Sequence, residues 1–260
     1  MSVTQKVLDR PANWSSLRLY DKSPAHWLHA QMFPPEQTPA MLVGSALHCF
    51  ELEPLDFWNR YVVAPQLDRR TKAGREAHAL FMEEQAAGKE VLTWEQHELI
   101  KSMHMALRKH PRAFKLIDLC AAHELRLDWI DDETGLPCTA RLDAVHTDGE
   151  PRLALDLKTC RDASPRGFAR TAADSLYHGQ AAFYMDALAA NGRTVDAFAF
   201  VAVEKDPPHC VAIHVCDEEM IEAGRALYRR LLDLHAECLL NKRWPGYEST
   251  NTLRLPAWAL

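Results

Sequence analysis

The run Leu153-Ala154-Leu155-Asp156-Leu157-Lys158 constrains the fold most, because it places two charged residues inside a strongly apolar strand pattern. Side chains alternate between the two faces of an extended strand. The three leucines can therefore enter a core, while Asp156 and Lys158 stand together on the opposite face. We expect that face to be solvated and the charged pair to be held on a rigid edge of a sheet.

A hairpin is predicted directly before this run. Residues 124–130 alternate in the same way, and the turn-forming stretch 131–135 leads into a second strand that carries Arg141. A hairpin followed by a third strand brings four charged residues within reach of one another: Glu124, Asp143, Asp156 and Lys158. Two or three carboxylates suit Mg²⁺ or Mn²⁺, which are hard cations. The alternative is that these residues only line a solvated strand face.

The segment from Asp174 to Ala190 is predicted to be a helix that ends at Asn191-Gly192, a pair that favours a left-handed stop. Tyr177, Gln180 and Tyr184 fall on one stripe of that helix. The stripe carries an amide and two phenols among alanines, so we expect something to be hydrogen-bonded there. The alternative is that the tyrosines pack and Gln180 is partly exposed.

The remaining elements are predicted from helix caps and from the periodicity of apolar residues. Helices are expected at Pro24 to Ala30, Pro39 to Leu52, Lys72 to Ala87 and Thr93 to His110, and a last helix is expected from Asp217. Strands are expected at roughly 122–130, 137–146, 152–158, 195–204 and 209–216. The order is therefore helices, then a sheet, then a helix.

Several short motifs follow one another in a specific order and spacing. They are Ser23-Pro24-Ala25-His26-Trp27, Gly44-Ser45-Ala46-Leu47-His48, Glu51-Leu52-Glu53-Pro54, Tyr61-Val62-Val63-Ala64-Pro65, Asp68-Arg69-Arg70-Thr71-Lys72, Asp156-Leu157-Lys158-Thr159 and Gln180-x-x-x-Tyr184. With Asp143, they resemble the PD-(D/E)xK nuclease superfamily, in its RecB-like and lambda-exonuclease-like branch, and in particular the C-terminal nuclease domain of the RecE (exonuclease VIII) family. The likeness runs from about Ser15 to Tyr184. It implies an α/β restriction-endonuclease-like core with a mixed central sheet flanked by helices, and an N-terminal helical wall.

The resemblance implies a metal site. His48, Asp143 and Asp156 match metal ligands, and the backbone carbonyl of Leu157 is a further ligand. Lys158 matches the lysine that orients the attacking water and neutralises charge on the phosphate. The implied cofactor is Mg²⁺ or Mn²⁺, with two ions per site.

Three further residues match the neighbourhood of that site. Gln180 and Tyr184 match residues that bind near the active-site phosphate and the end of the DNA, and Glu124 matches an acidic residue that flanks the site. The proline of the consensus is replaced here by Leu142, which leaves the following ligand in place. If the resemblance is set aside, the sequence around His48 indicates only a packed or surface histidine.

The resemblance also implies an activity and partners. It implies a 5′→3′ exodeoxyribonuclease that acts on the ends of linear double-stranded DNA and leaves 3′ overhangs for single-strand-annealing recombination of the phage or prophage type. A trimeric or tetrameric ring-shaped homo-oligomer and a single-strand annealing protein are the implied partners. The alternatives are an endonuclease or single-strand-specific nuclease of the same superfamily, or a DNA-binding protein that has lost catalysis.

The net negative charge of the chain is unfavourable for binding DNA unless positive residues are concentrated at one place. The chain carries −6, whereas counterion release rewards a positive surface. A nuclease can still concentrate cations in a channel; the candidates are Lys22, Arg69, Arg70, Lys72, Arg75, Arg161, Arg166 and Arg170. The resemblance places Ser16, Lys22 and Ser23 where they could receive a 5′ phosphate. For residues 68–75 the alternative is a solvated loop.

A chain of 260 residues can bury one substantial core, so a single nuclease domain over residues 1–260 is expected. It comprises a mainly helical part (1–120), the catalytic sheet with the Gln-x-x-x-Tyr helix (121–216), and a C-terminal helix with a docking tail (217–260). The sequence shows no membrane span and no secretory signal, so we expect a cytoplasmic protein. The seven scattered cysteines predict reduced thiols and no iron–sulfur cluster.

Overall fold

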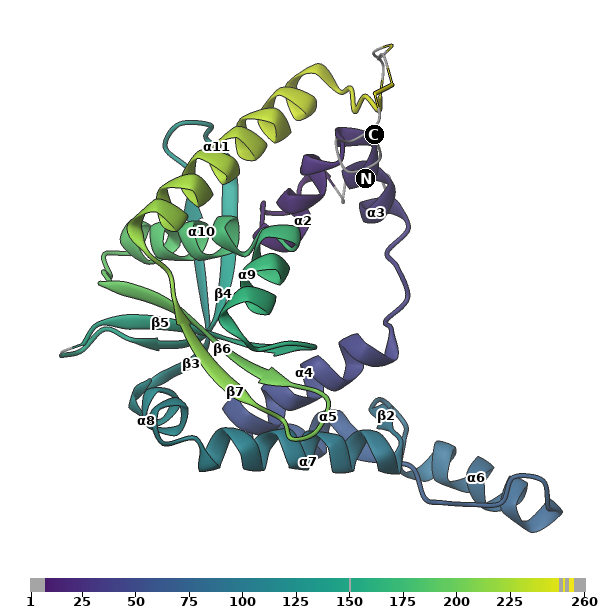
Figure 1. Cartoon of the computed structure of the whole chain (residues 1–260). Helices are drawn as coiled ribbons and strands as arrows, with labels where there is room; N and C mark the ends of the chain where they lie inside the picture. The colour runs from purple at the N-terminus through teal and green to yellow at the C-terminus, as the bar shows by residue number, and fades with distance from the viewer. Residues whose placement is uncertain (1–7, 150, 248–249, 251–252, 255–260) are drawn as a thin grey trace.

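A five-stranded mixed sheet forms the centre of the computed structural model, which describes residues 8–149, 151–247, 250 and 253–254 (Figure 1). In spatial order its strands are β3 (Ala122–Ile130), β4 (Pro137–His146), β5 (Leu153–Cys160), β6 (Ala197–Glu204) and β7 (Val211–Val215). β5 and β6 run parallel, and the other neighbouring strands run antiparallel. The predicted α/β class with a mixed sheet is confirmed, and all five strands lie close to their predicted positions.

β5 lies in the middle of this sheet rather than at its edge. Leu155 of β5 pairs with Ala144 of β4 on one side and with Ala199 of β6 on the other. The predicted edge position of Asp156 and Lys158 was therefore wrong. Alternation specifies the face that each side chain takes, but it does not specify which strands lie on either side.

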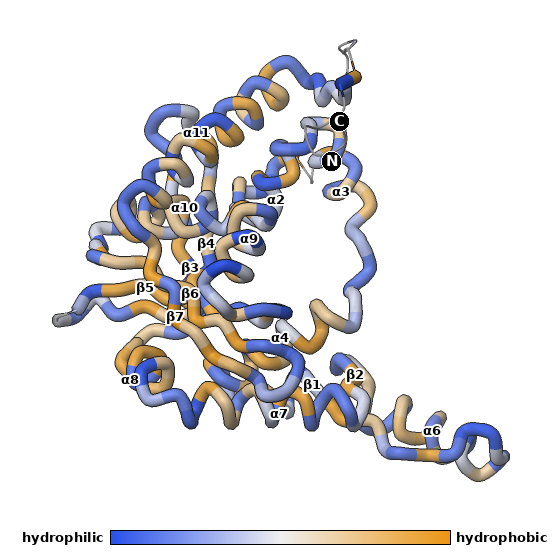
Figure 2. The backbone as a smooth tube through the Cα atoms, in the orientation of Figure 1, coloured by the Kyte–Doolittle hydropathy of each residue, from blue (hydrophilic) through white to orange (hydrophobic). Residues whose placement is uncertain are grey.

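Helices cover both faces of the sheet (Figure 1). The helices of one face are α4 (Pro39–Leu52), α7 (Trp94–Lys109) and α8 (Pro111–Leu119). They form the N-terminal helical wall, and their buried side chains share a core with Leu153, Leu155 and Leu157 of β5. The other face carries α2 (Trp14–Leu17), the 3-10 helix η1 (Arg18–Asp21), α3 (Pro24–Met32), α10 (Tyr177–Ala190) and α11 (Glu218–Asn241). Figure 2 shows the apolar strands enclosed between these two layers.

Smaller elements extend the first layer. They are α5 (Phe57–Arg60), the parallel pair β1 (Tyr61–Val63) and β2 (Glu90–Leu92), and α6 (Lys72–Glu84). α6 projects away from the body of the molecule (Figure 1). Within the described ranges, no helix has the length and apolar character needed to cross a bilayer.

Side-chain caps set several helix starts at the predicted residues. Thr93 and Gln96 form a reciprocal capping box before α7. Asp217 accepts a hydrogen bond from the backbone N–H of Met220 at the start of α11. Thr38 caps α4 in the same way. Caps depend on local sequence alone, which is why these boundaries were predictable.

The helix that carries Gln180 begins later than predicted. Asp174 ends a separate helix, α9 (Pro165–Asp174), and α10 starts at Tyr177. Between them Leu176 has a left-handed φ of 57°. Leucine rarely adopts that conformation, so the sequence carries no signal for the break. The predicted stop at the other end is present, with Gly192 at a φ of 70°.

Two connections tie the N-terminal helices to the rest of the chain. Residues 33–38 run from α3 to α4, hence from one helical layer to the other, and are exposed throughout. The C-terminal tail returns to η1 and α3: Trp244 Nε1 donates to the hydroxyl of Tyr20 at 3.1 Å, and the backbone N–H of Ala25 donates to Pro245 at 3.1 Å. The apolar residues Leu255, Pro256 and Trp258, also predicted to dock, lie outside the described residues.

Candidate active site

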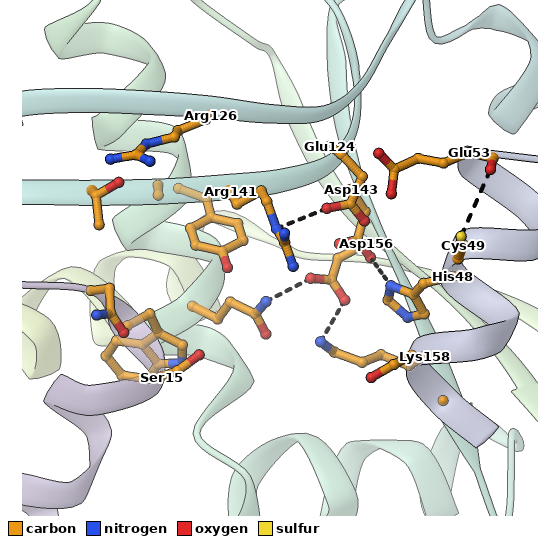
Figure 3. Close-up of a pocket in the computed structure, with 18 of the residues that line it drawn as sticks. Ser15, His48, Cys49, Glu53, Glu124, Arg126, Arg141, Asp143, Asp156 and Lys158 are labelled. Atoms are coloured by element: carbon orange, nitrogen blue, oxygen red, sulfur yellow. Dashed lines mark hydrogen bonds and ion pairs between the residues drawn. The ribbon is translucent and has the colours of Figure 1, made fainter. Parts of the chain in front are cut away.

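A cavity of about 580 Å³ opens between α2, α4, α10 and the strands β3 to β5 (Figure 3). Its lining contains most of the side chains that the sequence singled out: His48, Glu124, Asp143, Asp156, Lys158, Gln180 and Tyr184. These residues come from five different elements, so the fold brings them together from positions far apart in the sequence. Leu157 is buried beside the cavity and does not line it.

Asp143 lies where α4, β4 and β5 meet. Its Oδ2 atom accepts a 2.8 Å hydrogen bond from the backbone N–H of Leu157 on the neighbouring strand. The Nδ1 atom of His48 on α4 lies 3.3 Å from the same oxygen. Leu157 thus contacts the site through its N–H, and the predicted role of its carbonyl as a metal ligand stays a prediction.

Asp156 on β5 is held by two side chains. Nε2 of Gln180 donates to its Oδ1 atom at 2.6 Å, and Nζ of Lys158 lies 2.5 Å from its Oδ2 atom. The ammonium group of Lys158 also lies over the ring of Tyr177, 4.7 Å from the ring centroid. Both oxygens of Asp156 are therefore engaged, one by an amide and one by a cation.

The face of β5 that carries these charges is covered, which corrects the prediction that it is solvated. Asp156 is 1% exposed, and the side chain of Lys158 is 18% exposed. The reason is α10, which packs over this face and contributes Tyr177 and Gln180. Burial of a carboxylate is unfavourable unless it is paired, so the contacts with Lys158 and Gln180 are required for this packing.

α10 is itself held in register by a close contact with α2. A Cβ atom at Gly179 would lie 2.1 Å from the indole of Trp14, so only glycine allows this approach. Asn13 and Ser15, on either side of Trp14, line the cavity. The same contact therefore fixes one wall of the cavity relative to Gln180.

Glu124 faces Asp143 across the first two strands of the sheet. The pairs His123–Ala144 and Leu125–Leu142 lie on either side, so the register places Glu124 opposite Asp143. Glu124 has a left-handed φ of 49°, which a residue other than glycine adopts only when the surroundings impose it. Its carboxylate lies 2.8 Å from Nε of Arg141.

The donor set fits a hard divalent cation. His48, Glu124 and Asp143 each offer a ligand atom, and these atoms lie within 4.8 Å of one another. Carboxylate oxygens suit Mg²⁺ and Mn²⁺, and an imidazole is acceptable beside them. These three residues can therefore hold one ion, with Asp156 adjacent.

Charges in the site alter one another's pKa values. Burial lowers the pKa of His48, but Asp143 and Asp156 outweigh burial and raise it to about 9. Burial and the neighbouring Asp143 raise the pKa of Asp156 to about 6. Burial also acts to raise the pKa of Asp143, yet His48 and Lys158 bring it below its ordinary value. At neutral pH and without a metal ion, His48 is protonated and paired with an ionised Asp143.

The residues predicted to bind DNA do not line the cavity. Ser23 is 5% exposed, and its hydroxyl caps α3, so the structure gives it a local structural role. The hydroxyl of Ser16 donates to the carbonyl of Asn13. The others are exposed elsewhere: Lys22 follows η1, Arg69, Arg70 and Lys72 lie at the start of the α6 projection, and Arg161, Arg166 and Arg170 lie on and before α9. Their contact with DNA stays a prediction.

Sequence reasoning missed three arginines that line the cavity, Arg60, Arg126 and Arg141. For Arg141 a signal was present, because a residue two positions before Asp143 on one strand shares its face. Arg126 lies two positions after Glu124 on the preceding strand, so the same alternation predicts that these two side chains share a face. Arg60 reaches the cavity from α5, and no local pattern indicates this.

Comparison with known proteins bears on the fold. A family model described as a PDDEXK-like domain of unknown function (DUF3799) matches residues 13–256. No curated protein matches the chain. A crystal structure of a candidate exonuclease from Eubacterium rectale superposes with a TM-score of 0.65 at 11% sequence identity, covering 97% of this chain and 92% of that chain. A second crystal structure, of SSO0001, has a TM-score of 0.32 at 15% identity over 76% of this chain and 85% of its own.

Proposed function

Since this chain belongs to the family of PDDEXK-like domains of unknown function, we propose that it is a metal-dependent nuclease that hydrolyses phosphodiester bonds in DNA. The observation that carries the proposal is the meeting of Asp143, Asp156 and Lys158 from adjacent strands with His48 at one cavity. The arrangement combines ligands for a hard cation with a positive charge that can face a phosphate.

Each of these side chains has a distinct part in the proposed reaction. A divalent ion held by His48, Glu124 and Asp143 would supply Lewis-acid activation of water and phosphate. His48 must release its proton to solvent before its nitrogen can bind an ion, because Asp143 has to stay ionised to bind the same ion. Lys158, which Asp156 holds at 2.5 Å, supplies positive charge toward the phosphate, and Gln180 keeps Asp156 in place.

We further propose that the substrate is a linear duplex, degraded 5′→3′ to leave a 3′ overhang for annealing-based recombination. The ordered motifs that resemble RecE-like nucleases support this finer assignment, and the fold shared with the Eubacterium rectale candidate exonuclease is consistent with it. A trimeric or tetrameric ring and an annealing partner belong to the same proposal, because a closed ring keeps an exonuclease on its strand.

The test is digestion of a linear duplex labelled separately at its 5′ and 3′ ends, with Mg²⁺ or with EDTA, beside a covalently closed circle. Early metal-dependent release of the 5′ label with an intact circle is expected. Nicking of the circle would replace the exonuclease assignment by an endonuclease, and faster loss of labelled single strands would indicate a single-strand-specific nuclease.

The Lys158→Ala variant is the matched control in this assay. Its cleavage should fall to the level seen with EDTA, because the only lysine that lines the cavity among the described residues is lost. If wild type and variant both bind DNA and neither cleaves any substrate in Mg²⁺ or Mn²⁺, the protein has a binding role and the proposal is wrong.

A further inference from the structure

Arg141 is the cavity arginine whose ion-pair partner, Glu124, also belongs to the candidate metal ligands. It lies on β4 on the same face as Asp143, and its guanidinium points toward the carboxylates of the site (Figure 3). Its side chain is 67% exposed, whereas that of its partner Glu124 is 13% exposed. The guanidinium is therefore open to the cavity, while the carboxylate that holds it is only partly exposed.

The other two cavity arginines pair with carboxylates outside the group formed by His48, Glu124 and Asp143. Arg126 makes three hydrogen bonds to Asp128, and Nη1 of Arg60 donates to Glu53 at 2.7 Å. Within the described ranges, Arg141 has Glu124 as its single ion-pair partner, through Nε at 2.8 Å. A guanidinium has five N–H donors, so most donors of Arg141 remain available for phosphate oxygens.

The carboxylate of Glu124 can bind either Arg141 or a metal ion. It pairs with Arg141, and it also offers a ligand atom to the group formed with His48 and Asp143. A divalent ion carries twice the charge of a guanidinium and attracts the same carboxylate. Binding of the ion therefore weakens the ion pair between Glu124 and Arg141.

We propose that Arg141 binds a backbone phosphate of the DNA beside the one that is cleaved, and that Glu124 restrains it until a metal ion takes that carboxylate. This inference rests on the proposed nuclease function and assigns a phosphate-binding residue to its site. According to this inference the metal ion binds first, and Arg141 is then free to contact the DNA. A cation that has lost its carboxylate partner also attracts an anionic phosphate more strongly.

Two binding experiments on the full chain test this order. In the first, calorimetric titration with Mn²⁺ alone, without DNA, compares wild type with Arg141→Ala. Removal of the competing cation should tighten Mn²⁺ binding about 2- to 5-fold. In the Glu124→Gln background the same substitution should have a smaller effect, because the pair no longer exists.

In the second experiment, binding of a short duplex is measured in Ca²⁺ at several salt concentrations, with the DNA checked for integrity. Arg141→Ala should bind DNA about 10-fold more weakly and with a salt slope lower by about 1. Arg230→Ala is the control, since Arg230 pairs with the exposed Asp21 on the other helical layer and does not line the cavity. It should change neither measurement.

The outcomes separate this inference from the function on which it rests. Weaker Mn²⁺ binding by Arg141→Ala would mean that Arg141 only orients Glu124 for the ion, and would overturn the proposed exchange. Unchanged DNA affinity and salt slope would overturn the phosphate contact while the nuclease proposal stands. Failure of wild type to bind either Mn²⁺ or DNA would overturn both.

Discussion

Nε2 of Gln180 donates a 2.6 Å hydrogen bond to Oδ1 of Asp156, and both side chains are buried. The bond links α10 to the central strand β5 beneath the cavity. It leaves Oδ2 of Asp156 for Lys158. A buried carboxylate whose two oxygens have different fixed partners has a fixed orientation, and this makes the pair a direct target for mutation.

Gln180→Leu removes this donor at similar volume. We expect the free energy of unfolding to fall by about 1–3 kcal/mol, because Oδ1 of Asp156 remains buried without its partner. Loss of a hydrogen bond to the charged form also raises the pKa of Asp156 further, so cleavage near pH 7 should fall and partly recover at higher pH. Urea denaturation and a pH–rate profile measure these effects. Gln85→Leu, at an exposed position after α6, should alter neither.

The pH dependence of stability reports on His48. The pKa of His48 is raised from 6.5 to about 9 in the folded protein, so folding favours its charged form. That contribution to stability is fully present below pH 6.5 and is lost as pH rises through about 9. In EDTA, wild type should lose up to about 3 kcal/mol over this range relative to His48→Asn. Parallel urea curves for the two proteins at both ends of the range would contradict the ion pair with Asp143.

Metal binding should release protons. His48 is protonated at pH 7.5, and its nitrogen must be neutral to bind an ion. Calorimetric titration with Mn²⁺ in two buffers of different ionisation enthalpy should therefore give release of about one proton from wild type. His48→Asn should release fewer protons and bind the ion more weakly. Equal proton release by both proteins would show that His48 is not a ligand.

Lys158→Ala tests the chemistry and the packing separately. Cleavage should fall by at least about 100-fold, because positive charge beside the phosphate is lost. The free energy of unfolding should also fall, since Asp156 stays buried with Gln180 as its remaining partner, and the loss should be larger at pH 8 than at pH 5. The pKa of Asp156, about 6, sets this direction, because the uncharged acid tolerates burial better. A variant as stable as wild type at both pH values would contradict the buried ion pair.

A buried carboxylate behind the site should control the position of α4. Glu51 is 3% exposed and lies between Arg108 at 2.8 Å and His104 at 2.5 Å on α7. Arg108→Ala should destabilise the protein by about 3–5 kcal/mol, because it leaves a buried charge with less compensation. Lys101→Ala breaks an exposed pair with Glu98 on the same helix and should cost less than about 1 kcal/mol. Thermal denaturation of the two variants side by side provides the comparison.

Local patterns predicted the elements of the site well. Alternation in residues 153–158 placed Asp156 and Lys158 on one face, and the caps at Thr93 and Asp217 gave the starts of two helices. These signals are contained in a few neighbouring residues, which is why sequence alone was sufficient. Convergence of His48 with the strand carboxylates required the family resemblance, because no local pattern relates a helix to a strand far along the chain.

Features that depend on packing were not predictable. Alternation could not reveal that α10 covers the charged face of β5, or that β5 is central. The left-handed backbone at Glu124 and Leu176 arises from tertiary constraints that override residue preference. The resemblance gave no indication that the hydroxyl of Ser23 caps α3, and its suggested contact with DNA stays a prediction.

The exposed link at residues 33–38 gives the cavity an unusual construction. Asn13 and Ser15, which line one wall, belong to a segment joined to α4 only by this link, yet the segment is anchored by Trp14 against Gly179 and by the tail at Tyr20. Peptide continuity there contributes little to the shape of the cavity. Noncovalent contacts therefore hold the first helices in place. A chain cleaved within the link should reassemble from its two pieces by fragment complementation.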